Sequence, residues 1–318
     1  MYVEDIAPTP VAVPNLRAET PEWFDWAVAR PVASHFVNVG DCPIHYLLWP
    51  EDDPREARGG LLFLHGGGAH ANWWRFIAPF FTGSHRVAAY DLSGMGDSGA
   101  RKAYSATIRA DEINAVLTAA GFFEAGRPAP VLVGHSFGGL TAMRYASMHS
   151  ERLGGFIIAE SPIRSIEEER AHFESRPDAE PALRLYDTYE IGVDRFRLRP
   201  RQSCANDFVV EFIARHSLRE IEGGWSWKFD PFALTRDRHT EPFRDYLREV
   251  SCRTAFVYGE QSALCTPDVL AFTRTLLAPG TPFIGIPEGQ HHLTLDQPLA
   301  FVTAVRGILE NWRANAPG

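Results

Sequence analysis

The sequence has little cysteine and little positive charge. Its four cysteines form no C-x-x-C pair, so neither a disulfide framework nor a zinc site is predicted: Cys42, Cys204, Cys252 and Cys265. Its 31 lysines and arginines are outnumbered by 40 aspartates and glutamates, which gives a formal net charge of −9. Phosphate binding needs a basic field, and no long Lys/Arg block supplies one here. We therefore expect no nucleic-acid partner.

Long hydrophobic runs are missing as well. No stretch approaches 18 uncharged apolar residues, the length from which a membrane-spanning helix would be considered. The first residues carry Glu4 and Asp5 and do not place a basic start before an apolar stretch, which argues against a signal peptide. These absences predict a soluble, cytoplasmic protein with no membrane partner.

What the chain does contain is an alternation of short apolar runs and amphipathic segments. Four runs are continuous, as is typical of strands buried on both faces of a parallel sheet: Leu61–Leu64, Val87–Tyr90, Val131–Val133 and Phe156–Ile158. Between them, Ser105–Ala120 has the apolar stripe of a helix. Two alternating runs around Gly40-Asp41 predict an antiparallel hairpin. Together these patterns predict an α/β fold with an open sheet.

The strand rhythm is interrupted once. From Ile166 to Val250 the chain is charged and helical in character, and strand-like runs return at Thr254–Tyr258 and Phe283–Ile286. This pattern predicts an inserted helical subdomain of ordinary small-domain size. The predicted organisation is a first part of the core with an N-terminal arm over residues 1–160, a helical cap over 161–250, and a second part of the core over 251–318.

The sequence Gly134-His135-Ser136-Phe137-Gly138 follows one buried strand directly and opens a predicted helix. In that context a G-x-S-x-G pattern places a serine on a strained strand-to-helix turn, where small neighbours let its hydroxyl project outward. Ser136 is therefore the candidate nucleophile.

Two further segments lie where a serine nucleophile needs them. The glycine loop His65–Gly68 follows the Leu61–Leu64 run, and the backbone N–H of Gly67 could join that of Phe137 in an oxyanion hole. A histidine pair, His291 and His292, follows the last predicted strand, which is a suitable position for a general base.

With these motifs in this order, the sequence resembles the α/β-hydrolase fold superfamily from about Ser34 onward. The matching motifs are His65–Gly68, Asp91–Gly99, Gly134–Gly139 and His291–Pro298. The resemblance implies a mostly parallel, eight-stranded doubly wound sheet, a helical cap inserted after strand six, and a triad in the order serine, acid, histidine. It also favours His291 over His292, because the family's histidine usually lies five residues before an acid and seven before a proline.

The sequence departs from the family at the acid. Most relatives carry an aspartate after strand seven in a G-x-x-D pattern, but here the matching position is Ser262. Some members of the superfamily carry the acid after strand six instead, where this chain has Glu160. Glu160 is the preferred candidate, and Glu260 and Asp268 are the alternatives.

A serine at the nucleophile position excludes the relatives that act through an aspartyl ester, which leaves acyl transfer. Ser136 would attack a carbonyl, His291 would take its proton and Glu160 would hold the imidazolium, without a metal or organic cofactor. Three functions remain open. They are a serine hydrolase of a small to medium hydrophobic carboxylic ester or lactone, a carbon–carbon bond hydrolase of ring-cleavage diketones, and a non-catalytic relative that binds a small ligand.

Aromatic and basic segments bear on the small-molecule partner. Four tryptophans are candidates for contact with an apolar ester group, although packing between cap and core would explain them equally well: Trp73, Trp74, Trp225 and Trp227. The Arg195–Arg201 segment has alternate arginines and could form a positive rim for an anionic substrate. A solvated face is the more common role for such a run and is the favoured interpretation.

Overall fold

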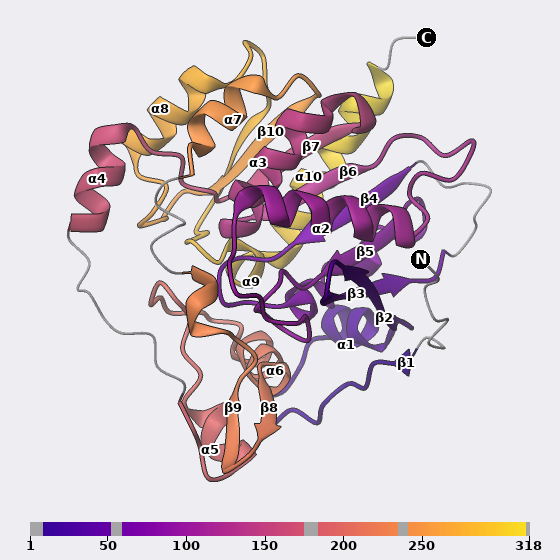
Figure 1. The fold of residues 1–318 in the computed structure, drawn as a ribbon, viewed down its shortest axis with the longest axis vertical. Coiled ribbons are helices and arrows are strands. Elements are labelled where there is room, and N and C mark those ends of the chain that lie inside the picture. The colour runs from indigo at the N-terminus through magenta and orange to yellow at the C-terminus, as the bar shows by residue number, and fades with distance from the viewer. Residues whose placement is uncertain (1–8, 52–58, 175–183, 235–240, 316–318) are drawn as a thin grey trace.

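The computed structural model describes residues 9–51, 59–174, 184–234 and 241–315, which are built around a nine-stranded sheet (Figure 1). The strand order is β1-β2-β3-β5-β4-β6-β7-β10-β11. From β5 through β11 neighbouring strands are parallel, whereas β1, β2, β3 and β5 pair antiparallel. The strands are β1 (Thr9–Pro10), β2 (Ala33–Val39), β3 (Cys42–Trp49), β4 (Gly60–Leu64), β5 (Arg86–Tyr90), β6 (Val131–His135), β7 (Gly155–Ala159), β10 (Thr254–Gly259) and β11 (Phe283–Ile286).

The sheet has one strand more than the eight predicted. The additional strand, β1, consists of Thr9 and Pro10 and pairs with Ser34 and Ala33 of β2. A proline cannot donate to the ladder, so it is tolerated at the outer edge of the sheet, where β1 lies. The other eight strands include the predicted hairpin, β2–β3, and the four predicted buried runs, so the mostly parallel α/β sheet is confirmed.

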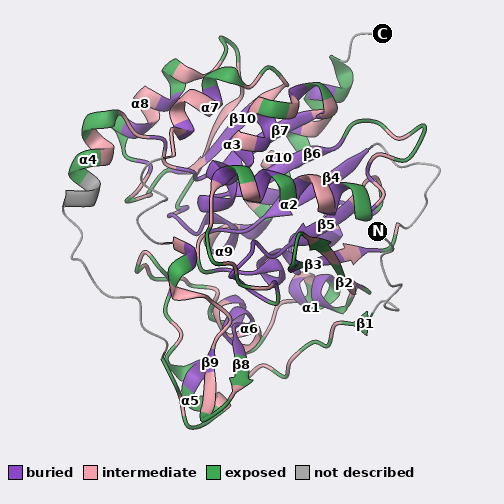
Figure 2. Cartoon of the chain, viewed as in Figure 1, coloured by how far each residue is buried: buried purple, intermediate pink, exposed green. Residues whose placement is uncertain are grey.

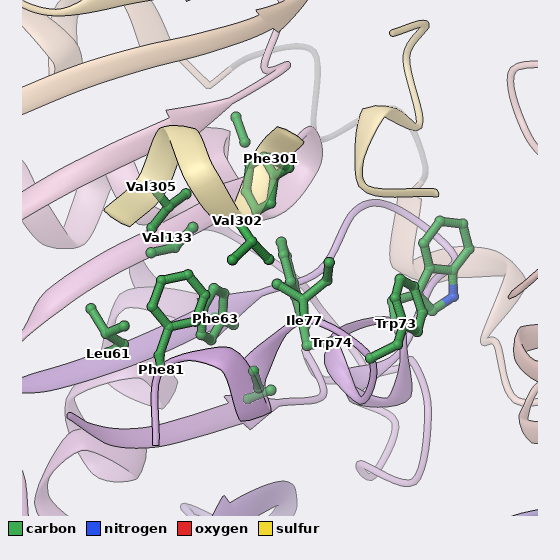
Figure 3. Close-up of a cluster of buried hydrophobic side chains, with 14 of the residues drawn as sticks. Leu61, Phe63, Trp73, Trp74, Ile77, Phe81, Val133, Phe301, Val302 and Val305 are labelled. Atoms are coloured by element: carbon green, nitrogen blue, oxygen red, sulfur yellow. The ribbon is translucent and has the colours of Figure 1, made fainter. Parts of the chain in front are cut away.

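The central strands are buried on both faces. Every residue of β4, β6 and β7 is buried (Figure 2). Leu61 and Phe63 belong to one apolar cluster and Leu62 and Leu64 to another, because successive side chains of a strand point to opposite faces. Figure 3 shows the first cluster, in which Phe63 lies with side chains of α10. The sheet thus has an apolar core on each face, and helices cover both cores.

The sequence predicted two of the helices that cover the sheet, the one over Ser105–Ala120 and the one that opens after Ser136. The predicted Ser105–Ala120 helix is α2, and the Ser105 hydroxyl caps it by accepting a hydrogen bond of 3.2 Å from the Ile108 N–H. The helices of the core are α1 (Glu22–Ala29), α2 (Ala106–Ala119), α3 (Phe137–His149), α8 (Pro267–Leu276), α9 (Leu293–Asp296) and α10 (Pro298–Ala314). The described residues also contain four short 3-10 turns, three in the core and the last in the insertion: Ala71–Trp74, Ala78–Phe80, Ser150–Arg152 and Pro231–Leu234.

The insertion leaves the sheet after β7, the sixth of the eight principal strands, and returns at β10. Part of it, comprising α5, α6, β8 and β9, forms the lobe at the bottom of Figure 1. The prediction that the insertion is entirely helical is wrong for β8 and β9, which form an antiparallel hairpin. Its turn contains Gly223 and Gly224, both with positive φ, and tryptophans favour the strand that follows. The elements are α4 (Ile166–Glu174), α5 (Tyr189–Asp194), α6 (Asp207–His216), β8 (Leu218–Ile221), β9 (Gly224–Trp227) and α7 (Phe243–Glu249).

Within the described residues, no helix combines the length and the hydrophobicity that crossing a membrane would require.

Candidate active site

Ser136 lies at the sharp turn between β6 and α3. Its backbone has φ +52° and ψ −119°, a conformation that L-residues rarely adopt. The Ser136 N–H donates a hydrogen bond of 2.9 Å to the carbonyl oxygen of Ala159 on β7, which fixes the turn at the carboxyl edge of the sheet. Strained backbone of this kind concentrates at functional sites, because the surrounding fold must hold it in place.

The glycines around Ser136 are sterically required. A Cβ added at Gly134 would lie 2.6 Å from the Cα of Gly139. One added at Gly138 would lie 2.4 Å from the carbonyl oxygen of His65. The glycines therefore allow the strand, the helix and the glycine loop to come into backbone contact, which the turn requires.

The glycine loop runs directly beside this turn. A Cβ added at Gly66 would lie 3.4 Å from the Cβ of Ser136, and one at Gly67 would lie 3.6 Å from the Cβ of Phe137. The Phe137 ring stacks against the Arg109 guanidinium at 4.8 Å and lines a different cavity from that of Ser136. The contribution of Phe137 to the Ser136 site would thus come from its backbone, as an oxyanion hole requires.

His291 and Glu160 form a buried pair beside Ser136. The His291 Nδ1 lies 3.4 Å from the Glu160 Oε1, and the two residues are 3% and 0% exposed. Glu160 follows β7 directly and has φ +52°, so it is a second non-glycine residue in a strained conformation. Because a carboxylate only accepts hydrogen bonds, Nδ1 carries the proton of this pair and Nε2 is left as the basic nitrogen.

Ser262, where the family's aspartate is missing, supports the Glu160 carboxylate. Its hydroxyl donates a hydrogen bond to Glu160 Oε1, and Glu160 Oε2 accepts a second one of 2.8 Å from the Gly259 N–H. The Ser262 oxygen in turn accepts hydrogen bonds of 3.1 and 3.0 Å from the N–H groups of Leu264 and Cys265. The hydroxyl is therefore fully engaged and holds the carboxylate toward His291.

The two alternative acids lie elsewhere. Glu260 and Asp268 are both exposed, and Asp268 belongs to the first turn of α8. The carboxylate that His291 contacts is that of Glu160.

The loop that carries His291 is tied to the insertion by Gln202. The Gln202 amide accepts a hydrogen bond of 3.0 Å from the His292 N–H and donates one of 2.8 Å to Asp296 Oδ2. The same Asp296 oxygen accepts a hydrogen bond of 3.0 Å from the Gln290 N–H, and burial raises the pKa of Asp296. Asp296, which helped to select His291 from the sequence, thus shapes the histidine loop.

Ser136 and His291 open onto one large cavity. Its volume is about 970 Å³, and its wall includes Gly67, Trp73 and Trp227. The core supplies one side of the cavity and the insertion the other, a common location for small-molecule sites.

Known proteins resemble this chain over most of its length. A model of the alpha/beta hydrolase family matches residues 61–305. The chain belongs to this family. Esterase Rv0045c of Mycobacterium tuberculosis is 27% identical over 276 residues, which are 84% of this chain and 86% of that protein. A haloalkane dehalogenase of Sphingobium indicum is 28% identical over 271 residues, 80% of this chain and 89% of that one.

Solved structures of the hydrolase fold are similar as well. The structure of E-2-(acetamidomethylene)succinate hydrolase has a TM-score of 0.72 at 21% identity and covers 88% of this chain and 99% of its own. That of the mycobacterial esterase has a TM-score of 0.65 at 24% identity and covers 87% and 90%. These likenesses confirm the α/β-hydrolase fold.

Two of the four tryptophans proposed to contact substrate lie elsewhere in this hydrolase. Trp73 and Trp227 line the cavity, but Trp74 is 2% exposed and packs in the core, with its ring 4.8 Å from that of Phe63. Trp225 lies outside the cavity wall and packs edge-on against Tyr189 at 4.9 Å. The prediction is therefore wrong for Trp74, which points into the core although the adjacent Trp73 lines the cavity. It is also wrong for Trp225, whose ring packs against Tyr189 although Trp227, on the same face of β9, lines the cavity.

Two further histidines lie against His291: His135, which the sequence did not single out, and His292, the alternative base. His135 Nε2 donates a hydrogen bond of 2.9 Å to the His291 carbonyl oxygen, and burial lowers the pKa of His135 to about 3. Burial also lowers the pKa of His292 well below its usual value. His135 occupies a variable position of the G-x-S-x-G pattern, which gives no hint of this positioning role. The one available signal was that His135 ends a predicted buried strand.

Two groups of side chains in the described part of the chain have metal-ligand types within 4.8 Å of one another. The first is His135, His291 and His292, whose imidazoles are the nitrogen donors that Zn²⁺ or Cu²⁺ accepts. The second is His45, Asp91 and Asp97. Asp91 Oδ2 already accepts hydrogen bonds of 2.7 and 2.8 Å from His45 Nδ1 and the Asp97 N–H, so this group is an internal hydrogen-bond network.

Proposed function

We propose that this protein hydrolyses carboxylic esters or lactones of small to medium hydrophobic substrates through an acyl-enzyme on Ser136. The observation that carries the proposal is the buried contact of 3.4 Å between His291 Nδ1 and Glu160 Oε1, because His291 lines the same cavity as Ser136. A base oriented by a carboxylate beside a strained serine is the arrangement that acyl transfer needs.

In the proposed mechanism His291 Nε2 removes the hydroxyl proton as the Ser136 oxygen attacks the substrate carbonyl. The N–H groups of Gly67 and Phe137 stabilise the oxyanion, and Glu160 stabilises the imidazolium that forms on His291. The imidazolium then protonates the departing alcohol. A water molecule, deprotonated by His291, hydrolyses the acyl-enzyme and restores Ser136.

The name of the mycobacterial esterase, which aligns with most of this chain, supports an ester as the substrate class. Trp73 and Trp227 on the cavity wall support an apolar portion of the substrate. Cleavage of a carbon–carbon bond in a ring-cleavage diketone would use the same nucleophile and remains the second candidate, because the His65–Gly68 loop resembles that branch of the family.

The test is intact-protein mass after treatment with a small fluorophosphonate, which reports an activated serine without a choice of substrate. One adduct on the wild-type chain and none on Ser136→Ala would support the proposed nucleophile. Parallel assays with an ester panel and a ring-cleavage diketone would then separate the two candidate reactions. A folded protein that forms no adduct and hydrolyses no ester would overturn the proposal in favour of a ligand-binding role.

A further inference from the structure

The cavity that contains Ser136 has a strongly cationic entrance. The described residues of its wall include five arginines and a lysine but only one acidic residue, Asp187. The basic residues are Arg184, Arg195, Arg197, Arg199, Arg201 and Lys228. The whole chain carries a net charge of −9, so the entrance has the opposite sign to the molecule. A local field of this kind concentrates anions at a cleft that the rest of the surface would repel.

Most of this charge has no carboxylate partner among the residues that the structure describes. Lys228 pairs with Asp97 at 2.7 Å, and the Arg197 guanidinium donates a hydrogen bond of 2.8 Å to the Asp194 carbonyl oxygen. By contrast, Arg195, Arg199 and Arg201 form no ion pair with any residue that the structure describes. Arginines at a cleft without a carboxylate partner are suited to bidentate recognition of a carboxylate or phosphate.

The arginine segment alternates in burial. Leu198 is buried in the core cluster and Phe196 packs against it, whereas Arg195, Arg197 and Arg199 are exposed. This alternation anchors the segment through its apolar side chains and leaves the guanidinium groups on the solvent side. The interpretation of Arg195–Arg201 as a merely solvated face is therefore incomplete, because these residues also line the Ser136 cavity.

The segment is also held in place relative to the candidate base. Gln202, the residue after Arg201, accepts a hydrogen bond of 3.0 Å from the His292 N–H. Asn206 donates one of 2.7 Å to the Leu295 carbonyl oxygen, in the same histidine loop. The cationic side chains thus belong to a segment whose position is set by contacts with the loop that carries His291.

On this basis we propose that the preferred substrates are esters with an anionic group, a carboxylate or phosphate, at the end remote from the scissile carbonyl. Arg195, Arg199 and Arg201 bind the anion, while Trp73 and Trp227 contact the apolar chain between the two ends. The inference rests on the proposed ester hydrolysis and specifies its substrate class. An anionic group at the entrance orients the chain with its carbonyl toward Ser136.

The test compares 4-nitrophenyl esters that share one leaving group. Each set contains a neutral alkanoate, the dicarboxylate half-ester of equal chain length and the corresponding phosphonoalkanoate, over acyl chains of five to eight carbons. The measured quantity is the ratio of kcat/KM for the anionic ester to that for its neutral counterpart. The carboxylate and phosphonate arms show which anion is preferred, and the chain-length series finds the span that reaches the arginines.

The variant is Arg195→Gln/Arg199→Gln, and its matched control is Arg219→Gln/Arg248→Gln, which removes two exposed arginines that do not line the cavity. We expect the anionic-to-neutral ratio to exceed one in the wild type and to fall about tenfold in the first variant, a change of about 1.4 kcal/mol. The control should keep the wild-type ratio. A wild-type ratio near or below one for every anionic ester, or an equal fall in the control, would overturn the inference.

A binding measurement keeps this test separate from that of the proposed function. Calorimetric titration of Ser136→Ala with the half-esters needs no hydrolysis, and the arginine substitutions in this background should weaken binding about tenfold. Raising sodium chloride from about 50 to 500 mM should also weaken it, because salt screens exposed charges. Binding that depends on the arginines without wild-type hydrolysis would reject the ester-hydrolase function but retain the anion site. Hydrolysis without an anion preference would reject only the anion site.

Discussion

The Ser262 hydroxyl donates a hydrogen bond to the carboxylate of Glu160, although the two residues are 102 positions apart in the sequence. Ser262 follows β10 and Glu160 follows β7, and these strands are neighbours in the sheet. The carboxylate that contacts His291 thus follows the adjacent strand, and the residue at the position expected for the acid donates a hydrogen bond to it. This exchange suggests that the acid could be moved back.

We predict that Glu160→Gln lowers kcat about 10³- to 10⁴-fold, because His291 loses the group that fixes its tautomer and stabilises its charge. In the double variant Glu160→Gln/Ser262→Asp, a carboxylate returns one hydrogen-bond length from the original one, and kcat should recover at least tenfold. Ester hydrolysis under saturating substrate measures both effects.

The controls for this prediction are Glu260→Gln and Asp268→Asn, which remove the exposed alternative acids. Each should keep kcat within about twofold, since neither carboxylate contacts the His291 pair. If Glu160→Gln retained wild-type kcat while either control abolished it, the assignment of the acid would be wrong.

His291 and His292 are adjacent, so substituting each in turn tests which one is the general base. His291 contacts Glu160, whereas His292 is buried with its ring 5.3 Å from that of Trp73. We expect His291→Ala to abolish both hydrolysis and labelling by a fluorophosphonate. His292→Ala should remain labelled, because the proton acceptor is still present. Loss of labelling in His292→Ala with full labelling of His291→Ala would exchange the two roles.

Trp74 and Trp227 should respond differently to the same substitution. Trp74 fills the core near Phe63, so Trp74→Ala is expected to lower the free energy of unfolding by about 3–5 kcal/mol. Trp227 is half-buried on the cavity wall, and Trp227→Ala should raise KM for esters with apolar chains while costing less stability. Urea unfolding and steady-state kinetics of the two variants provide the comparison. Equal losses of stability would contradict the distinction.

The outcome for the tryptophans shows where inference from the sequence ends. Ser136, Glu160 and His291 each follow a strand, and parallel strands bring their carboxyl ends to one edge of the sheet, so the sequence order predicted that they would meet. Whether Trp74 faces the core or the cavity depends instead on the direction of a short 3-10 turn, which composition does not reveal.

Contacts between distant segments could not be predicted from the sequence either. Gln202 and Ser262 bond to residues about 90 and 102 positions away. No local pattern marks Gln202, and the G-x-x-D pattern marked Ser262 only as the position where an aspartate is missing. The β8–β9 hairpin was missed because the charged residues of β8 resemble those of the helical segments around it, although Gly223-Gly224 was a turn signal.

Alanine substitution at two glycines compares the tightly packed turn at Ser136 with an open position on a helix. In Gly138→Ala the new methyl group would lie 2.4 Å from a backbone oxygen of His65, so the turn must distort, and we expect loss of ester hydrolysis and of about 1–3 kcal/mol of stability. Gly307 is exposed within α10 and has no atom within 4 Å of an added Cβ. Gly307→Ala should therefore stabilise the protein by about 0.5–1 kcal/mol, measured by thermal unfolding, with activity retained.

His70 makes the stability of the fold depend on pH. Its Nε2 lies 2.9 Å from the Ser217 hydroxyl, whose own proton is donated to the Ile213 carbonyl oxygen, so Nε2 carries the imidazole proton. The Nδ1 is buried without a partner among the described residues, and burial lowers the pKa of His70 from 6.5 to about 3. The unfolded chain therefore binds a proton below about pH 6.5 that the folded protein takes up only near pH 3.

Because the unfolded state binds more protons in this interval, the contribution of His70 to stability is complete above pH 6.5 and is lost as the pH falls. Between pH 7 and pH 5 the loss from this one histidine should be about 2 kcal/mol. His70→Gln keeps a hydrogen-bond donor for Ser217 but cannot be protonated, so the difference in unfolding free energy between pH 7 and pH 5 should shrink by that amount. Urea titrations of wild type and variant at both pH values measure the difference. An unchanged pH dependence in His70→Gln would mean that His70 is protonated in the folded protein or that other groups alone set the slope.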